Sequence, residues 1–310
     1  MTGEDVAADP VAELDDAAWA LAAVIATYRD AAGSSLAGAL AADPDRAAVL
    51  AAAGLVQGAG GSVVPGPALL DGPLAGNVAA ARLSSLRQAV EVAAGEAPPG
   101  WSALPDEVLL DQGHASAATG HALATRLVPT LAGLADRLAA PGSRVLDIGT
   151  GVGALALALA RELPNTHVTG IDVLARAIEL ARTELRQAGS LAERVELRQQ
   201  DVADLREPAA YDLIWLPAPF LPESSLNAAL PHIVAAIAPG GWLVAGTNPA
   251  PASPLAAAVA QWNAARNGGN ALDADTVAAR LGELGLGHVG QRPTVPGGPV
   301  LVTGQHTPDN

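Results

Sequence analysis

The stretch RVLDIGTGVG, residues 144–153, combines a carboxylate with a glycine-rich loop. A short apolar run ends in Asp147, and glycines follow at alternate positions, Gly149, Gly151 and Gly153. A strand that leads through such a loop into a helix usually receives phosphate, because main-chain N–H groups and the helix N-terminus attract negative charge. Here a carboxylate stands at the mouth of the loop, so the pattern indicates a ligand that carries positive charge there.

A dinucleotide is one ligand that this loop could hold, because Gly149, Gly151 and Ala154 satisfy the spacing G-x-G-x-x-G/A. Asp147 argues against it, since a carboxylate two residues before the first glycine would repel the pyrophosphate. S-adenosylmethionine would instead be attracted, because it presents an ammonium group and a sulfonium. We therefore expect S-adenosylmethionine, and an NAD(P)-dependent oxidoreductase is the alternative function.

Residues 144–220 resemble class I S-adenosylmethionine-dependent methyltransferases, and the similarity continues more loosely to the C-terminus. VLDIGTGVGALALALA is similar to their first motif, and Asp172 ends the segment VTGID 19 residues after Gly153. Three further segments stand in the order that this family has: QQDVADL around Asp201, YDLIWLPAPF as the fourth strand, and IAPGGWLV after the fifth helix.

This resemblance implies S-adenosylmethionine as the cofactor, S-adenosylhomocysteine as its product, and no metal. Asp172 would hydrogen-bond both ribose hydroxyls. Asp201, or the neighbouring Asp204, would lie beside the adenine amino group, with Val202 against the ring. The cofactor-binding residues implied in this way are Asp147, Gly149, Thr150, Gly151, Asp172, Val173, Asp201, Val202, Leu216 and Pro217.

The fourth-strand segment LPAPF, residues 216–220, bears on the acceptor. Methyltransferases that act on amide or base exocyclic nitrogens resemble one another in an Asn or Asp followed by Pro-Pro and an aromatic residue. This segment contains no amide or acid, which argues against a nucleic-acid or protein-glutamine target. The sequence has no cysteine, which excludes thiolate-dependent methylation of carbon. We expect O- or C-methylation of a small-molecule acceptor in secondary metabolism.

A hydroxyl acceptor must lose a proton, and histidine removes protons well near neutral pH. His114 and His121 are seven residues apart, so they share one face of a continuous helix directly before the cofactor strand. Such a helix commonly runs beside the cofactor in this family, and we predict that both histidines are catalytic. The other histidines stand in linker, helix, turn or tail contexts: His167, His232, His288 and His306.

Residues 1–100 have mostly helical patterns, with two short apolar runs around a glycine-rich turn in LVQGAGGSVVP. Helices followed by a hairpin predict a winged-helix-like domain or an irregular helical cap. The order resembles the dimerisation domain of small-molecule O-methyltransferases from natural-product pathways, which implies a homodimer whose N-terminal helices close the acceptor pocket. The proline-rich stretch EAPPGW then leads into a methyltransferase domain at 101–310.

Short apolar runs alternate with helical patterns from residue 143 onward, which is typical of a parallel, doubly wound sheet. Together with the resemblance, this predicts an α/β fold: a Rossmann-like doubly wound seven-stranded sheet, mostly parallel, beside a mainly helical N-terminal domain. The pattern before it, residues 109–142, predicts one long helix or a pair interrupted at Pro129. Strands are expected at 143–149, 167–172, 194–201, 211–217, 240–246 and 298–305, and helices at 153–163, 173–188, 223–238 and 272–285.

The composition is that of a globular protein of 310 residues, with 50% apolar and 16% charged side chains. A net charge of −15 without any basic run argues against a nucleic-acid partner. It therefore also disfavours a further alternative, a non-catalytic methyltransferase-like regulatory protein that binds DNA. The N-terminus is acidic and the apolar stretches are short, so we expect a cytoplasmic protein without a membrane partner.

Overall fold

The computed structural model describes residues 9–59, 62–66, 69, 75–95, 100–248, 251–294 and 299–307. The chain divides into two compact units, Met1–Val90 and Glu91–Asn310. The predicted proline-rich linker lies largely outside the described residues, as does the tip of the predicted hairpin.

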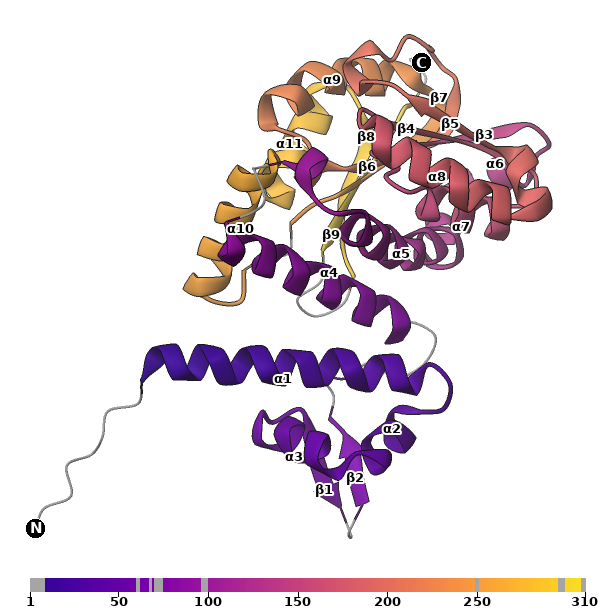
Figure 1. The fold of residues 1–310 in the computed structure, drawn as a ribbon. Helices are drawn as coiled ribbons and strands as arrows, with labels where there is room; N and C mark the ends of the chain where they lie inside the picture. Colours follow the sequence, from indigo (N-terminus) through magenta and orange to yellow (C-terminus); the bar gives the residue numbers. More distant parts are fainter. Residues whose placement is uncertain are drawn as a thin grey trace, which may run out of the picture. The chain divides into compact units, whose positions relative to one another are not determined.

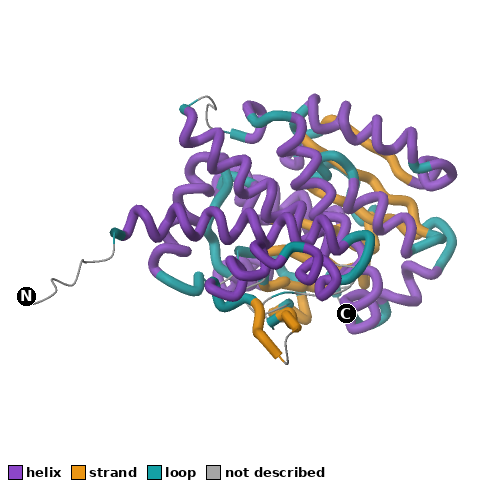
Figure 2. The backbone as a smooth tube through the Cα atoms, turned by 60° about the horizontal axis from the view of Figure 1, so that its bottom comes forward, coloured by secondary structure: helices purple, strands orange, loops and turns teal. Residues whose placement is uncertain are grey.

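The first unit consists of helices and one hairpin (Figures 1 and 2). Its helices are α1 (Pro10–Ala31), α2 (Leu36–Ala42), α3 (Pro44–Ala52) and α4 (Ala75–Ala94), of which α4 continues beyond the end of the unit. Strands β1 (Val56–Ala59) and β2 (Ser62–Pro65) pair antiparallel, which confirms the predicted hairpin. Helix α3 begins at Pro44, and the side chain of its N-cap Asp43 accepts the main-chain N–H of Arg46.

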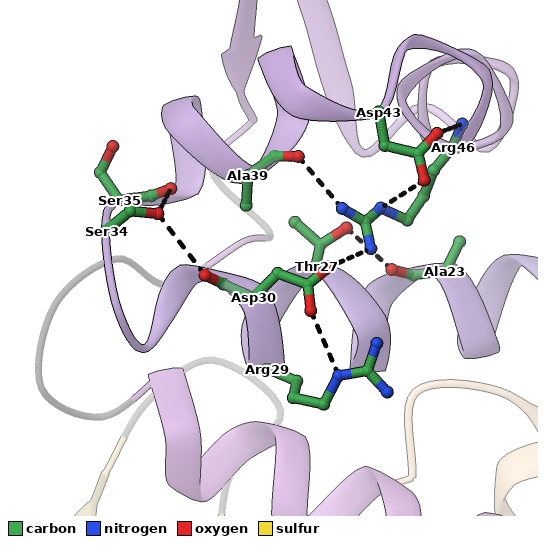
Figure 3. Close-up of polar contacts among 9 residues, drawn as sticks. All are labelled: Ala23, Thr27, Arg29, Asp30, Ser34, Ser35, Ala39, Asp43 and Arg46. Atoms are coloured by element: carbon green, nitrogen blue, oxygen red, sulfur yellow. Dashed lines mark hydrogen bonds and ion pairs between the residues drawn. The ribbon is translucent and has the colours of Figure 1, made fainter.

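Arg46 joins three helices of the first unit (Figure 3). Its guanidinium, only 12% exposed, donates to Asp30 Oδ2 of α1 at 2.6 Å and to the carbonyl of Ala39 in α2 at 3.1 Å. The hydrogen bonds from Arg46 and Arg29 lower the pKa of Asp30. Because Arg46 lies in α3, this one side chain fixes how α1, α2 and α3 pack. The apolar core of the unit includes Tyr28, Leu36, Leu40 and Leu50.

A seven-stranded sheet forms the centre of the second unit (Figures 1 and 2). Its strands are β3 (Ser143–Ile148), β4 (Thr166–Asp172), β5 (Val195–Gln199), β6 (Tyr211–Pro217), β7 (Ile237–Gly246), β8 (Gly287–Pro293) and β9 (Val300–Gln305). They lie in the order β5-β4-β3-β6-β7-β9-β8. Neighbours from β5 to β7 are parallel, and β9 is antiparallel to both β7 and β8. This confirms the predicted Rossmann-like, mostly parallel sheet.

Helices cover both faces of this sheet (Figure 1). On one face lie α6 (Leu134–Ala139), α7 (Ala154–Glu162) and α8 (Ala175–Gln187), and on the other lie α9 (Glu223–Ala236) and α11 (Ala274–Glu283). Helix α5 (Asp106–Ala122) packs on α7. Each face buries its own apolar cluster, so the sheet is apolar on both sides, as parallel strands covered by helices require.

The order of the strands determines where a ligand can bind. After β3 the chain first adds β4 and β5 on one side and then returns to add β6 and β7 on the other. The loops that leave neighbouring strands at this reversal diverge, and the resulting crevice outside the carboxyl ends of the strands is the usual binding place in open α/β sheets. The crevice lies where β3 ends in the glycine loop.

Several elements differ from the sequence prediction. Strand β8 and helix α10 (Pro254–Asn267) are not predicted, and β7 begins at Ile237, earlier than the expected residue 240. The helix pattern at 109–142 resolves into α5, a π-helical turn η2 (Leu123–Leu127), a short 3-10 turn η3 (Val128–Thr130) and α6. The interruption at Pro129 is confirmed, because proline lacks the N–H that a continued helix would need.

Candidate active site

The glycine loop leaves β3 with left-handed backbone angles at alternate residues. The φ angle is 63° at Gly149, 55° at Gly151 and 80° at Gly153, a region that side-chain-bearing residues rarely occupy. The main-chain N–H of Thr150 donates to the carbonyl of Ile171, the penultimate residue of β4, at 3.0 Å. The loop is therefore fixed to the neighbouring strand before α7 begins.

Asp147 is buried beneath this loop, with 1% of its surface exposed. Thr150 Oγ1 donates a hydrogen bond to Asp147 Oδ2 at 2.7 Å. The pKa of Asp147 is raised to about 7, mainly by burial and to a smaller extent by the charge of Asp172, and the hydrogen bond from Thr150 opposes the shift. A carboxyl group in this state gains strongly from a nearby cation, because the cation replaces the solvation lost on burial.

Thr150 is held in place by the neighbouring strand. Gly170 of β4 faces its side chain, and a β-carbon at residue 170 would lie 2.6 Å from Thr150 Oγ1. Thr150 is only 4% exposed and fills the space that Gly170 leaves. The sequence analysis assigned Thr150 to the cofactor site through resemblance alone, and the structure adds a positioning role toward Asp147.

Asp172 ends β4 and turns back toward the glycine loop. Its Oδ2 accepts the main-chain N–H of Gly151 and its Oδ1 that of Leu174, both at 2.9 Å. Burial raises the pKa of Asp172, and these main-chain donors oppose the shift. A carboxylate accepts about four hydrogen bonds, so each oxygen keeps capacity for one further donor. Asp172 therefore fits the predicted pair of ribose hydroxyls.

The predicted adenine-side residues lie at the ends of β4 and β5. Val202 is buried, and Val173 is 54% exposed. Asp201 is exposed, and its Oδ1 accepts the main-chain N–H of Ala203 at 2.9 Å, at the start of a short 3-10 turn. Asp204, on the same turn, is also exposed. Asp201 stays the predicted partner of the adenine amino group, with Asp204 as the alternative.

Leu216 and Pro217, at the end of β6, close the other side of the loop. Both are buried, and Pro217 Cγ lies 3.4 Å from the position that a β-carbon on Gly149 would take. The segment from Leu216 to Leu221 contains only apolar side chains. This segment therefore offers no amide or carboxylate side chain of its own.

The structure does not bring His114 and His121 together at the glycine loop. His114 Nε2 lies 3.9 Å from Glu184 Oε2 of α8, and His121 Nδ1 lies 3.0 Å from Glu162 Oε1 of α7. Their side chains are 53% and 51% exposed. Their catalytic role stays a prediction.

Helix α5 meets the loop through glycines instead. A β-carbon at Gly113 would lie 2.0 Å from Val152 Cγ2, and one at Gly120 would lie 2.8 Å from the carbonyl oxygen of Leu155. This pair is not among the predicted site residues, although two glycines seven residues apart in a helix are a visible signal of a close helix contact.

A segment that sequence reasoning missed, Trp101–Asp106, crosses the carboxyl edge of the sheet. We call it the strap. At one end the Trp101 ring packs edge-on against Phe220 after β6, with ring centroids 5.5 Å apart. At the other end Arg176 of α8 donates to Asp106 Oδ1 at 2.6 Å and to the carbonyl of Leu104 at 3.0 Å. Leu104 itself is fully buried.

A separate cavity of about 390 Å³ lies at the opposite, amino ends of β3, β4 and β5. Its polar lining includes Arg144, His167, Glu193 and Arg194. None of the predicted cofactor residues lines it. Within the described residues no cluster of three or more His, Asp or Glu side chains could hold a metal, and no described helix is long and apolar enough to span a membrane.

Comparison with known proteins identifies the domain that contains this site. A family model described as a methyltransferase domain matches residues 145–241. The release factor glutamine methyltransferase of Rhodopirellula baltica is 39% identical over 114 residues, which cover 36% of this chain and 37% of that protein. The chain thus matches little more than a third of the length of this curated relative.

Solved structures resemble a much larger part of the chain. The S-adenosylmethionine-dependent methyltransferase SibL in its apo form has a TM-score of 0.61 at 20% identity, covering 96% of this chain and 99% of that one. The mitomycin 7-O-methyltransferase MmcR has a TM-score of 0.59 at 19% identity, covering 96% of this chain and 97% of that one. At these identities the likeness establishes the fold.

The chain has the fold of the S-adenosylmethionine-dependent methyltransferases that it resembles. Residues 145–241 are its methyltransferase domain. The match to a methyltransferase domain supports the enzyme class expected from the sequence over a dinucleotide-dependent oxidoreductase.

Proposed function

We propose that this chain transfers the methyl group of S-adenosylmethionine to oxygen or carbon of a small-molecule acceptor in secondary metabolism. The observation that carries the proposal is the apolar end of β6, where Leu216 and Pro217 are buried beside the glycine loop. An acceptor amide there would lose its hydration without gaining a hydrogen-bond partner from this segment, which is costly. A hydrophobic acceptor would lose no hydrogen bonds to water when it binds beside this segment.

The chain's own residues account for binding and orientation of the cofactor. Asp147, held by Thr150, lies under the loop that would receive the ammonium end, and Asp172 would hold the ribose. S-adenosylmethionine, when bound, supplies a methyl group on a positively charged sulfur. Since transfer is a single displacement, alignment of acceptor, methyl and sulfur is the main task of the protein. The rigid loop and the end of β6 would hold the cofactor end of this alignment in place.

Methylation of a protein glutamine is a second candidate, because the curated relatives with the printed name glutamine methyltransferase share sequence with this chain. Two observations favour the small molecule. The match to the relative from Rhodopirellula baltica covers 36% of this chain, whereas the likeness to the mitomycin 7-O-methyltransferase covers 96%. The segment after β6 also lacks the acid or amide expected for nitrogen acceptors.

Radiolabelled methyl transfer distinguishes these acceptors. The full chain is incubated with methyl-labelled S-adenosylmethionine and, in separate reactions, with a panel of phenols and enols or with purified bacterial release factors. We expect label in the organic extract of at least one small-molecule reaction and none in the release-factor band. Labelled release factor without labelled small molecule would overturn the proposal in favour of the second candidate.

We also propose that the protein is a cytoplasmic homodimer. The first unit supports the dimer, because the first half of α1 exposes the large apolar side chains Val11, Leu14 and Trp19 at 65%, 60% and 75%. A second copy that covered these side chains would remove that apolar surface from water. Light scattering of the full chain should give twice the mass of one chain, and Trp19→Glu should reduce it. A wild-type mass of one chain contradicts the dimer, and cell fractionation tests the location.

A further inference from the structure

The turn after β6 is clamped by one buried side chain. Asn270 is 7% exposed, and its Nδ2 donates to the carbonyls of Ala218 at 2.7 Å and Leu221 at 2.8 Å. Its main-chain N–H donates to the carbonyl of Pro219 at 3.1 Å. Three hydrogen bonds from one residue hold the four-residue turn, so its shape is set before any ligand arrives.

The clamp also depends on close backbone packing. A β-carbon at Gly269 would lie 2.1 Å from the carbonyl oxygen of Pro219, so only glycine allows this approach. Between the clamped carbonyls the turn presents Phe220, the one phenylalanine of the chain, with 46% of its surface exposed. The protein thus rigidly holds a large apolar ring where water can reach it.

The strap places a second ring beside Phe220. Trp101 meets it edge-on, with an interplanar angle of 86°. The other end of the strap is anchored on Arg176, in the first turn of α8 after β4. Since β4 and β6 are the two neighbours of β3, a segment attached after both strands passes the end of β3 before it leads into α5. Strands β4 and β6 themselves lie two strand spacings, about 10 Å, apart.

We propose that Phe220 and Trp101 form one wall of the acceptor site and that the acceptor presents a planar aromatic ring to this wall. The inference rests on the proposed function and names its substrate class. Aromatic rings favour stacked or edge-to-face contacts with other rings, and the exposed part of Phe220 offers such a contact. The turn carries no charged or hydrogen-bonding side chain, so it selects ring shape and not polarity. Asn270 is a positioning residue for this wall.

The test uses 2-naphthol as the probe and its fully saturated analogue, decahydro-2-naphthol, as the matched non-planar alcohol. Equilibrium dialysis measures the binding of each to the full chain saturated with S-adenosylhomocysteine. We expect wild type to bind 2-naphthol at least fivefold more tightly than the saturated alcohol. Phe220→Ala should lose at least fivefold in 2-naphthol affinity, and Asn270→Ala should lose part of it. Trp262→Ala removes a 59% exposed ring of α10 and should leave the affinity unchanged.

Equal binding of the two alcohols by wild type, or equal 2-naphthol affinity in wild type and Phe220→Ala, overturns the proposal. Calorimetry with S-adenosylhomocysteine on the same proteins separates this outcome from a failure of the proposed function. We expect all variants to bind S-adenosylhomocysteine as wild type does. Normal cofactor binding without any dependence of the probe on Phe220 overturns the aromatic wall alone. Absence of cofactor binding by wild type overturns the proposed function as well.

Discussion

The glycine loop and the outer face of α5 adjoin each other, because Gly113 of α5 packs directly against the loop. Ionisable side chains in the two regions nevertheless stand in opposite surroundings. Asp147 is almost fully buried, and main-chain N–H groups hold Asp172. His114 and His121 are half exposed, and each pairs with a carboxylate on a different helix.

The two regions differ in the groups that pair with these side chains. In the loop the hydrogen-bond donors belong to backbone that the sheet fixes. An acid there cannot move to a new position when a neighbouring residue is replaced. On α5 both members of each pair are long side chains in water, where rotamer freedom and screening reduce the interaction to about 0–1 kcal/mol. We expect changes in the loop to have large effects and changes on the outer face of α5 to have small ones.

The largest effect is expected from the buried charge of Asp147. Its pKa is about 7 in the folded protein and near 3.8 when unfolded, so the folded state holds a proton that the unfolded chain releases. The stability that Asp147 contributes is therefore present below about pH 4 and is lost as the pH rises through about 7, by at most about 1.4 kcal/mol per pH unit. Asp147→Asn removes this term. Denaturant unfolding without cofactor should show the variant gaining on wild type between pH 4 and 7, with no further change above.

A difference between wild type and Asp147→Asn that is the same at every pH would contradict the buried charge. Asp106→Asn is the matched control, because it makes the same change at an exposed ion pair of the strap.

Asp172→Ala should weaken the binding of S-adenosylhomocysteine by roughly 10- to 100-fold. The variant would remove the predicted hydrogen bonds between this carboxylate and the ribose hydroxyls, worth about 1.5–3 kcal/mol. Isothermal titration calorimetry measures the loss. Glu184→Ala, which removes an acid on the neighbouring helix α8, should retain wild-type affinity. Affinity that is unchanged in Asp172→Ala would refute the ribose assignment.

Thr150→Val should have a smaller effect on cofactor affinity, about fivefold near neutral pH. Valine keeps the shape that fits against Gly170 but cannot donate to Asp147, and one such hydrogen bond is worth about 1 kcal/mol. Because the bond opposes the rise in the pKa of Asp147, its loss leaves more of the carboxyl protonated at pH 7. The deficit should shrink at higher pH, and Thr150→Ser should restore affinity. A deficit equal at all pH values would indicate lost packing alone.

The smallest effects are expected on α5. His114→Ala and Glu184→Ala should couple by about 0.2–1 kcal/mol in a double-mutant cycle of unfolding free energies. Turnover tests the predicted catalytic role separately, since loss of this exposed pair alone should leave turnover within about twofold of wild type. A fall in turnover with unchanged cofactor affinity, in His114→Ala or His121→Ala, would instead support their predicted role as general bases.

The sequence predicts best where geometry follows from the backbone. Strand β6 has the predicted limits, and the glycine spacing identifies the loop because alternate left-handed residues leave few other shapes. Residue spacing in a helix predicts less. His114 and His121 do share a face of α5, but the direction of that face depends on where Gly113 and Gly120 pack. That packing is a contact between elements, which no local pattern contains.

Two missed elements show the same limit. Helix α10 buries no residue, so it has no apolar periodicity toward a core. Strand β8 contains Gly290 and Pro293, and His288 has a positive φ of 49°, so its sequence does not alternate like a strand. The strap was missed because the partners of Trp101 and Asp106, Phe220 and Arg176, are distant in the chain.

The missing β-carbon of Gly170 makes two distant positions inseparable in any redesign of this enzyme. Alanine at 170 would place its β-carbon 2.6 Å from Thr150 Oγ1 and 2.9 Å from Thr150 Cβ, so it requires a smaller residue at 150. A library that varies the loop alone would therefore sample only side chains compatible with glycine in β4. Varying positions 150 and 170 together allows residue pairs that neither single change allows. Such pairs would change the strength of the interaction between Asp147 and a bound cation.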